Sequence, residues 1–177
     1  PMTDAITFEG IRRGSRSLLA AYLNGNDLAA REDMALCSLF GGLGLANGGL
    51  GAVHGFAGPM GGMFEAAHGV ICASLLPYVM KYNVKAVSQV NAGEALKARY
   101  IEIARVLTGD THAEIDDGVA WLEALSAKLG IPRLRDLGIT PSDFEMIISK
   151  SKVSSSMQKN PVKLSAPILQ SILEEAY

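Results

Sequence analysis

The stretch 50-LGAVHGFAGPMGGMFEAAHGVICASLLPYVMKYN-83 decides how the fold is interpreted. It places two histidines, His54 and His68, in one of the most apolar and glycine-rich parts of the chain. On one unbroken helix, at about 1.5 Å per residue, their side chains would lie about 21 Å apart. The glycines and the proline at 58–62 instead predict a turn between two helices. The two imidazoles can therefore converge.

Two converging imidazoles are compatible with a metal site, in which each ring nitrogen comes within about 2.0–2.2 Å of the ion. Two hydrogen-bonded core histidines are the alternative, and the spacing leaves both interpretations open. Catalytic zinc or iron sites usually take three or four protein ligands. The remaining histidine, His112, lies in the polar stretch 109–112, where we expect it to be exposed. Nothing in the sequence marks Asp4 or Glu65 as a ligand.

Apolar residues recur at helical spacing along the rest of the chain, and no alternating strand pattern of useful length is present. The expected class is therefore all-α, a multi-helix bundle of about seven or eight helices. The glycines at 41–51 are expected to end the second helix, and the serines at 154–156 to form a loop. Besides a short helix around His54, we expect helices at 3–23, from 27 into the glycines, and at 66–82, 92–108, 115–129, 141–151 and 165–175.

The composition is that of a globular protein, with 177 residues, 49% hydrophobic residues and 19% charged residues. We expect one helical domain over residues 1–177. A net charge of -2 argues against a nucleic-acid surface. We expect no membrane span, since no apolar run reaches the roughly 18 residues required. Cys37 and Cys72 are isolated in apolar helical patterns, so we expect small buried residues rather than a bridge, which suits a cytoplasmic protein.

The motif around the two histidines resembles the C-terminal helical domain of the iron-containing (group III) alcohol dehydrogenases, a dehydroquinate synthase-like fold. That family carries G-x-x-H-x-x-x-H-P-x-G-x-x-x-x-x-x-H-G followed by L-L-P-x-V-x-x-x-N. Here the motif reads GAVH at 51–54, GFAGPMG at 55–61, HG at 68–69 and LLPYVMKYN at 75–83. Weaker similarity covers nearly the whole chain, including Lys159-Asn160-Pro161.

The resemblance implies a divalent metal, with iron expected first and zinc as the alternative, held by one Asp and three His. Two of these ligands match His54 and His68. The other two form an Asp-x-x-x-His pattern that this chain lacks, and in the family they lie just upstream. The NAD(P)-binding α/β domain with its Gly-Gly-Gly-Ser loop is also absent. The glycines at 41–51 follow a predicted helix rather than a strand, so they cannot replace that loop.

These absences, and a first residue of Pro1 rather than Met, indicate a C-terminal fragment of a longer enzyme. The intact enzyme would interconvert a small alcohol and its aldehyde with NAD(P), as a homo-oligomer, and this chain alone would be inactive. One departure concerns the family's middle histidine, which is Gly58 here. We therefore assign no catalytic acid or base. The alternative function is a non-catalytic helical interaction domain derived from such an enzyme.

Overall fold

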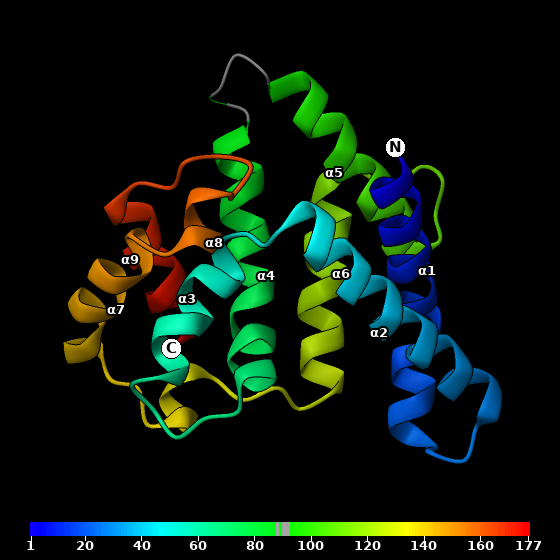
Figure 1. Cartoon of the computed structure of the whole chain (residues 1–177), viewed down its shortest axis with the longest axis horizontal. Helices are drawn as coiled ribbons and strands as arrows, with labels where there is room; N and C mark the ends of the chain where they lie inside the picture. Colours follow the sequence, from blue (N-terminus) through cyan, green and yellow to red (C-terminus); the bar gives the residue numbers. More distant parts are fainter. Residues whose placement is uncertain (88, 90–92) are drawn as a thin grey trace. The chain divides into compact units, whose positions relative to one another are not determined.

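The computed structural model describes residues 1–87, 89 and 93–177, and all of the regular structure in these residues is helical (Figure 1). The expected all-α class is confirmed. The expected start of a helix at residue 92 lies outside the described residues. The helices are α1 (Met2–Leu23), α2 (Leu28–Gly48), α3 (Ala52–Gly61), α4 (His68–Val87), α5 (Gly93–Thr108), α6 (Ile115–Lys128), α7 (Phe144–Lys152), α8 (Ser155–Gln158) and α9 (Ala166–Ala176), with 3-10 turns η1 (Leu134–Leu137) and η2 (Pro141–Asp143).

The helices are grouped into two compact units, each described here by itself. Unit 1 comprises Pro1–Gly49 and Ala98–Leu129, and unit 2 comprises Leu50–Lys97 and Gly130–Tyr177. The expectation of a single domain over 1–177 stays a prediction.

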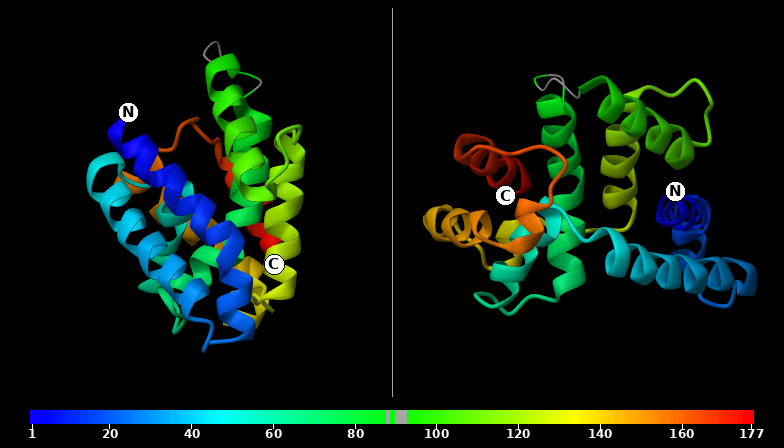
Figure 2. Two further views of the ribbon diagram at one scale, coloured as in Figure 1. Left: turned by 90° about the vertical axis from the view of Figure 1, so that its right-hand side faces the viewer. Right: turned by 45° about the horizontal axis from the view of Figure 1, so that its top comes forward.

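The glycines near the end of α2 do not end it, contrary to expectation, because α2 runs on to Gly48. They allow a close approach to α1, which lies side by side with α2 in unit 1 (Figure 2). A Cβ on Gly44 would lie 3.1 Å from Oγ1 of Thr7, and one on Gly48 would lie 3.9 Å from Cγ2 of Thr3. Because glycine has no side chain, these positions let the two helices approach each other, and they do not end α2.

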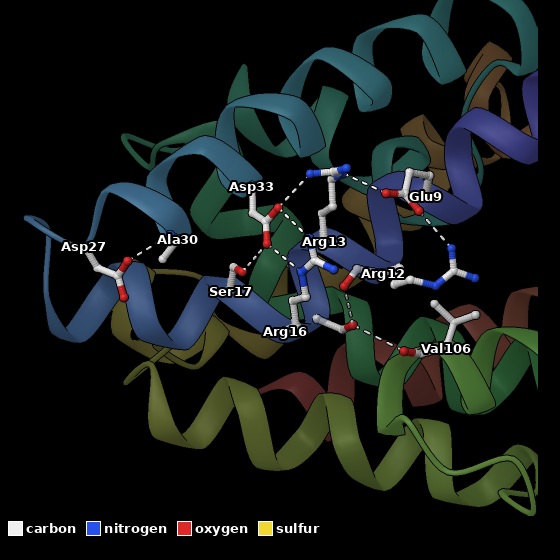
Figure 3. Close-up of polar contacts among 10 residues, drawn as sticks. Glu9, Arg12, Arg13, Arg16, Ser17, Asp27, Ala30, Asp33 and Val106 are labelled. Carbon is white, nitrogen blue, oxygen red and sulfur yellow. Dashed lines mark hydrogen bonds and ion pairs between the residues drawn. The ribbon is translucent and has the colours of Figure 1, made fainter.

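Asp33 of α2 is a buried carboxylate that links the same two helices, because side chains of α1 donate hydrogen bonds to it (Figure 3). It accepts hydrogen bonds from Nη1 of Arg13 at 2.8 Å, from Nε of Arg16 at 2.6 Å and from Oγ of Ser17 at 2.6 Å. These bonds hold the pKa of Asp33 well below its ordinary value, with Arg16 as the largest cause and Ser17 next. Asp33 is therefore ionised at neutral pH, and its charge is fully partnered.

Residues 98–108 of α5 also belong to unit 1, where α5 and α6 approach closely at one point, Ala104 and Gly118. A Cβ on Gly118 of α6 would lie 2.8 Å from Cβ of Ala104 and 3.0 Å from its Cα. Only glycine permits that approach without a shift of one helix.

Unit 2 is built around α3, which packs against α4, α7 and α8, while α4 also packs against α9 (Figure 1). Phe56 and Met60 of α3 are completely buried, so they belong to the core. The serines at 154–156 form no loop, because Ser154 caps α8 by accepting a hydrogen bond from the backbone nitrogen of Met157 at 3.1 Å. The fully buried side chains of the unit also include Ile71, Leu75, Leu134, Ile139, Ile147, Leu169, Ile172 and Leu173.

Among the described residues no single helix is long and apolar enough to cross a membrane. Only α2 and α3 taken together, as a bent pair, meet the criteria of length and composition, which is weak evidence.

Candidate metal centre

The two predicted ligands lie on consecutive helices of unit 2. His54 is in the first turn of α3, and His68 is the first residue of α4. Residues 62–67 connect the two helices, which pack against each other. The start of α3 is fixed from a distant part of the chain, since the backbone nitrogen of Ala52 donates to Oδ1 of Asn160 at 3.0 Å. Both histidines therefore project from packed helices rather than from a long loop.

The turn between the helices brings the two imidazoles together. The ring centroids of His54 and His68 lie 5.2 Å apart, and the ring planes are inclined by 52°. His54 is partly buried, whereas His68 is exposed. Burial lowers the pKa of His54, and the neighbouring His68 lowers it further. His54 is therefore held as the neutral imidazole, the form that donates a lone pair to a metal.

A third donor, Cys72, lies beside the histidines. It is one helical turn after His68 on α4, and its Sγ lies 3.5 Å from Nε2 of His68. One possible ligand atom from each of His54, His68 and Cys72 lies within 4.8 Å of the others. Among the described residues, His54, His68 and Cys72 form the one group of at least three His, Cys, Asp or Glu side chains placed closely enough to hold an ion.

The apolar pattern around Cys72 predicted a small buried residue, whereas the structure leaves it partly exposed beside His68. The signal that could have identified it is the His-x-x-x-Cys spacing from His68, because residues four apart on a helix share a face. Burial raises the pKa of the Cys72 thiol. Without a metal the thiol is therefore protonated at neutral pH.

The donors fit a divalent transition metal. Imidazole and thiolate suit zinc and iron better than magnesium or calcium, which prefer oxygen ligands. In a tetrahedral site with bonds of about 2.1 Å to nitrogen and about 2.3 Å to sulfur, neighbouring donors lie about 3.4–3.6 Å apart. The 3.5 Å between Nε2 of His68 and Sγ of Cys72 already matches this spacing. A separation of up to 4.8 Å would have to close by about 1.2–1.4 Å, which side-chain rotation can supply.

The other residues considered as ligands lie elsewhere. Asp4 pairs with Nη2 of Arg99 at 2.9 Å in unit 1. His112 is exposed in a turn, as predicted, and Glu65 is exposed between α3 and α4. None of the three belongs to the cluster of His54, His68 and Cys72.

Gly58, which replaces the family's middle histidine, lies one turn after His54 on α3. A Cβ built there meets no other atom within 4 Å. The position therefore has room for a side chain on the helix face that carries His54, and the chain supplies none.

Comparisons with known proteins cover the whole chain. The family model described as "Fe-containing alcohol dehydrogenase family, C-terminal" matches residues 1–177. The chain is 33% identical over 188 residues to 1,3-propanediol dehydrogenase of Citrobacter freundii, covering 100% of this chain and 45% of that protein. It is 35% identical over 185 residues to long-chain-alcohol dehydrogenase 1 of Geobacillus thermodenitrificans, covering 100% and 44%. The chain thus spans about half the length of the curated relatives it matches.

Solved structures give the same result. A crystal structure of 1,3-propanediol oxidoreductase superposes with a TM-score of 0.89 at 33% identity, covering 100% of this chain and 46% of that one. An alcohol dehydrogenase from Oenococcus oeni superposes with a TM-score of 0.87 at 32% identity, covering 100% and 45%. The shared region in both cases is the whole of this helical chain.

Proposed function

Because the chain belongs to the Fe-containing alcohol dehydrogenase family and corresponds to its C-terminal part, we propose that it is the metal-binding half of an NAD(P)-dependent alcohol dehydrogenase. The observation that carries the proposal is the convergence of His54 and His68, whose ring centroids lie 5.2 Å apart. The sequence motif predicts these two residues as ligands, and the fold brings their rings together from two helices.

The chain's own residues would hold the metal and leave one side of it open. His54, kept neutral by its partly buried position, and His68, which is exposed, would each donate a ring nitrogen. A divalent metal at this position would supply Lewis-acid polarisation of the oxygen of an alcohol or aldehyde. We propose iron as the resident metal because the family is defined by iron, with zinc as the alternative that imidazole ligands also suit.

The rest of the reaction requires parts that this chain does not carry. Hydride transfer belongs to the nicotinamide cofactor, which we propose is bound by an upstream α/β domain that supplies the remaining metal ligands. The chain covers 45% of the 1,3-propanediol dehydrogenase it matches, which leaves room for such a domain. We further propose a small alcohol or aldehyde as substrate, a homo-oligomeric enzyme and no activity from this chain alone.

Helix α2 carries an exposed apolar surface that suits contact with another domain. Large apolar side chains on it are exposed, with Leu28 at 82%, Leu39 at 56% and Leu45 at 49% of their full accessibility. Exposed apolar surface of this kind marks an interaction face. We propose that the upstream domain covers part of it.

A second function, a non-catalytic helical interaction domain, is favoured by one observation. Gly58 provides no side chain where the family has a histidine, and a glycine cannot move a proton. Under this alternative His54 and His68 would pack side by side without a metal. The exposed face of α2 would then bind a protein partner.

The deciding experiment compares metal binding by the intact enzyme that contains this chain and by its double variant His54→Gln/His68→Gln, because two imidazoles without the remaining ligands hold an ion weakly. Titration with Co²⁺, followed by its visible absorption, should show binding to the wild type and little or none to the double variant. His112→Gln is the matched control, because it removes an exposed histidine in unit 1 and should leave binding unchanged. Equal cobalt binding by the double variant and the wild type would contradict the metal function and favour the interaction domain.

A further inference from the structure

We propose that Gly58 determines the substrate class of this site, because it leaves room beside His54 for a bulky, uncharged group next to the reacting oxygen. The substrates would then include branched and aromatic alcohols and aldehydes as well as the smallest ones. The inference rests on the proposed metal function of His54 and His68 and adds a specificity-determining residue to it.

The first argument is the position of Gly58 on α3. His54 and Gly58 are four residues apart on this helix, so they lie on one face in successive turns. Residues with that spacing have their Cβ positions about 5–6 Å apart. A substrate whose oxygen is bound beside His54 therefore has position 58 among its nearest neighbours on the helix.

The second argument is the orientation of that face. Phe56, Ala57 and Met60 of the same helix are completely buried. They fix the rotation of α3 about its axis, because they point into the core of unit 2. The face that carries His54 and Gly58 is thereby kept outside the core, where a small molecule can reach it.

The third argument is the free space at Gly58. The residue is exposed, and a Cβ built there meets no other atom within 4 Å. Two neighbouring glycines differ, since a Cβ on Gly51 would lie 2.9 Å from Oδ1 of Asn160 and one on Gly55 would lie 2.9 Å from Cβ of Met157. Packing explains Gly51 and Gly55, whereas no contact within this chain requires a glycine at 58.

A glycine inside a helix also makes the helix less stable than an alanine would. Gly58 lies within α3 and not at its end. The position thus gives up helix stability without a packing reason in this chain, which is expected where a bound molecule needs the space.

The sequence around Gly58 determines the chemistry of the group that fits. Residues 34–64, which include all of α3, contain no Asp, Glu, Lys or Arg. Met63 and Phe64, which follow α3, are apolar and half-buried. A phosphate or carboxylate on the substrate would find no cation on this helix, and a charge removed from water without a partner is costly. The group beside Gly58 is therefore uncharged.

The test uses the intact, metal-loaded enzyme that contains this chain and compares the reduction of benzaldehyde with that of acetaldehyde. The ratio of kcat/KM for benzaldehyde to kcat/KM for acetaldehyde should fall from the wild type to Gly58→Ala and further to Gly58→Val. For Gly58→Val we expect a fall of about 10- to 200-fold, the range that one methylene group can discriminate in an apolar pocket. A poorly folded variant lowers both values and leaves their ratio unchanged.

The matched control is Gly61→Val, which makes the same change in open space about 10.5 Å along the helix axis from His54. It should keep the wild-type ratio. An equal fall in Gly61→Val and Gly58→Val would contradict a specific role of Gly58. A wild-type ratio in Gly58→Val would also overturn the inference and would mean that the upstream domain fills the space.

Metal content separates this inference from the proposed function. Gly58→Val should bind as much Co²⁺ as the wild-type enzyme, whereas His54→Gln/His68→Gln should not. If the wild type binds cobalt and reduces both aldehydes but Gly58→Val keeps its ratio, the metal function stands and only the role of Gly58 is wrong. If the wild type binds no cobalt and reduces neither aldehyde, both proposals fail.

A second measurement detects the occupant of the space without relying on turnover. In the intact variant Gly58→Cys, saturating benzyl alcohol should slow alkylation of the introduced cysteine more than the same concentration of ethanol, as read by peptide mass spectrometry. Alkylation of Cys37, which lies in unit 1, should be the same with both alcohols. Equal alkylation rates at position 58 with and without benzyl alcohol would contradict the proposal.

Discussion

Nδ2 of Asn160 donates a hydrogen bond to Oδ1 of Asn83 at 2.7 Å, which ties the segment after α8 to a buried residue of α4. The same amide donates to the carbonyl of Val162 at 2.7 Å, and its Oδ1 accepts from the backbone nitrogen of Ala52 at 3.0 Å. One side chain thus joins the start of the helix that carries His54 to the helix that carries His68. These bonds give a structural reason for the weak similarity to the family motif at Lys159-Asn160-Pro161.

Substitution of Asn160 should therefore weaken both the fold and the metal site. Asn160→Ala leaves the nitrogen of Ala52 and the amide of Asn83 without this partner, and we expect a loss of about 1–3 kcal/mol in the free energy of unfolding. Urea denaturation followed by circular dichroism measures that loss, and cobalt titration should show weaker binding. Asn26→Ala, in the exposed loop before α2, is the matched control. Unfolding midpoints that coincide for the two variants would contradict this role of Asn160.

Gly118 should tolerate no larger residue. Its Cβ would lie 2.8 Å from Cβ of Ala104, so Gly118→Val must push α6 away from α5 and should cost about 1–3 kcal/mol. Gly25→Ala is the control, because a Cβ there meets nothing within 4 Å. The double variant Gly118→Ala/Ala104→Gly should lose less stability than the sum of its single changes. Simple additivity would show that the two positions are not in contact.

The stability of the chain should depend on the charge of Asp33 in acid. Its folded-state pKa lies below the unfolded value of about 3.9, so its contribution is complete above that pH and is lost as the pH falls below it. Thermal unfolding from pH 7 to pH 3 should show a smaller decrease in Tm for Asp33→Asn than for the wild type. Asp33→Asn should also be less stable at pH 7. Asp116→Asn, which changes an exposed carboxylate, should keep the wild-type pH dependence.

Introducing a histidine at position 58 should add a donor to the metal site. Gly58→His places an imidazole four residues after His54, on the same face of α3, where space is available. We expect the cobalt affinity to rise by about tenfold, which corresponds to about 1.4 kcal/mol. The control is Gly61→His, also in open space but about 10.5 Å along the helix axis from His54, too far to share its ion. Equal gains from the two variants would mean that the added histidine acts without joining the site.

Much of the fold follows from local sequence patterns. Helical periodicity placed the helices, and the glycines and proline at 58–62 indicated the break that makes His54 and His68 neighbours. The motif then identified those two residues and the family. The helices, the break and the family are confirmed because each depends on residues close together in the sequence, while the two ligands stay a prediction.

The expectation for the glycines failed because of packing between distant segments, whereas the serines at 154–156 were misassigned because Ser154 caps a short helix locally. The glycines at 41–51 predicted the end of a helix, yet α2 continues to Gly48, and α1 packs against two of these glycines, Gly44 and Gly48. Intrinsic propensity was overridden by a tertiary contact.

The sequence by itself determined an all-helical chain, its family and two candidate ligands. Only the tertiary structure decided that Cys72 lies beside His68, that Asn160 joins α3 to α4, and that Asp33 is enclosed by groups from α1. Local patterns report the periodicity of one helix. The partners of a side chain depend instead on which helices pack together and at what rotation about their axes, and that choice is made by the buried core of the folded chain.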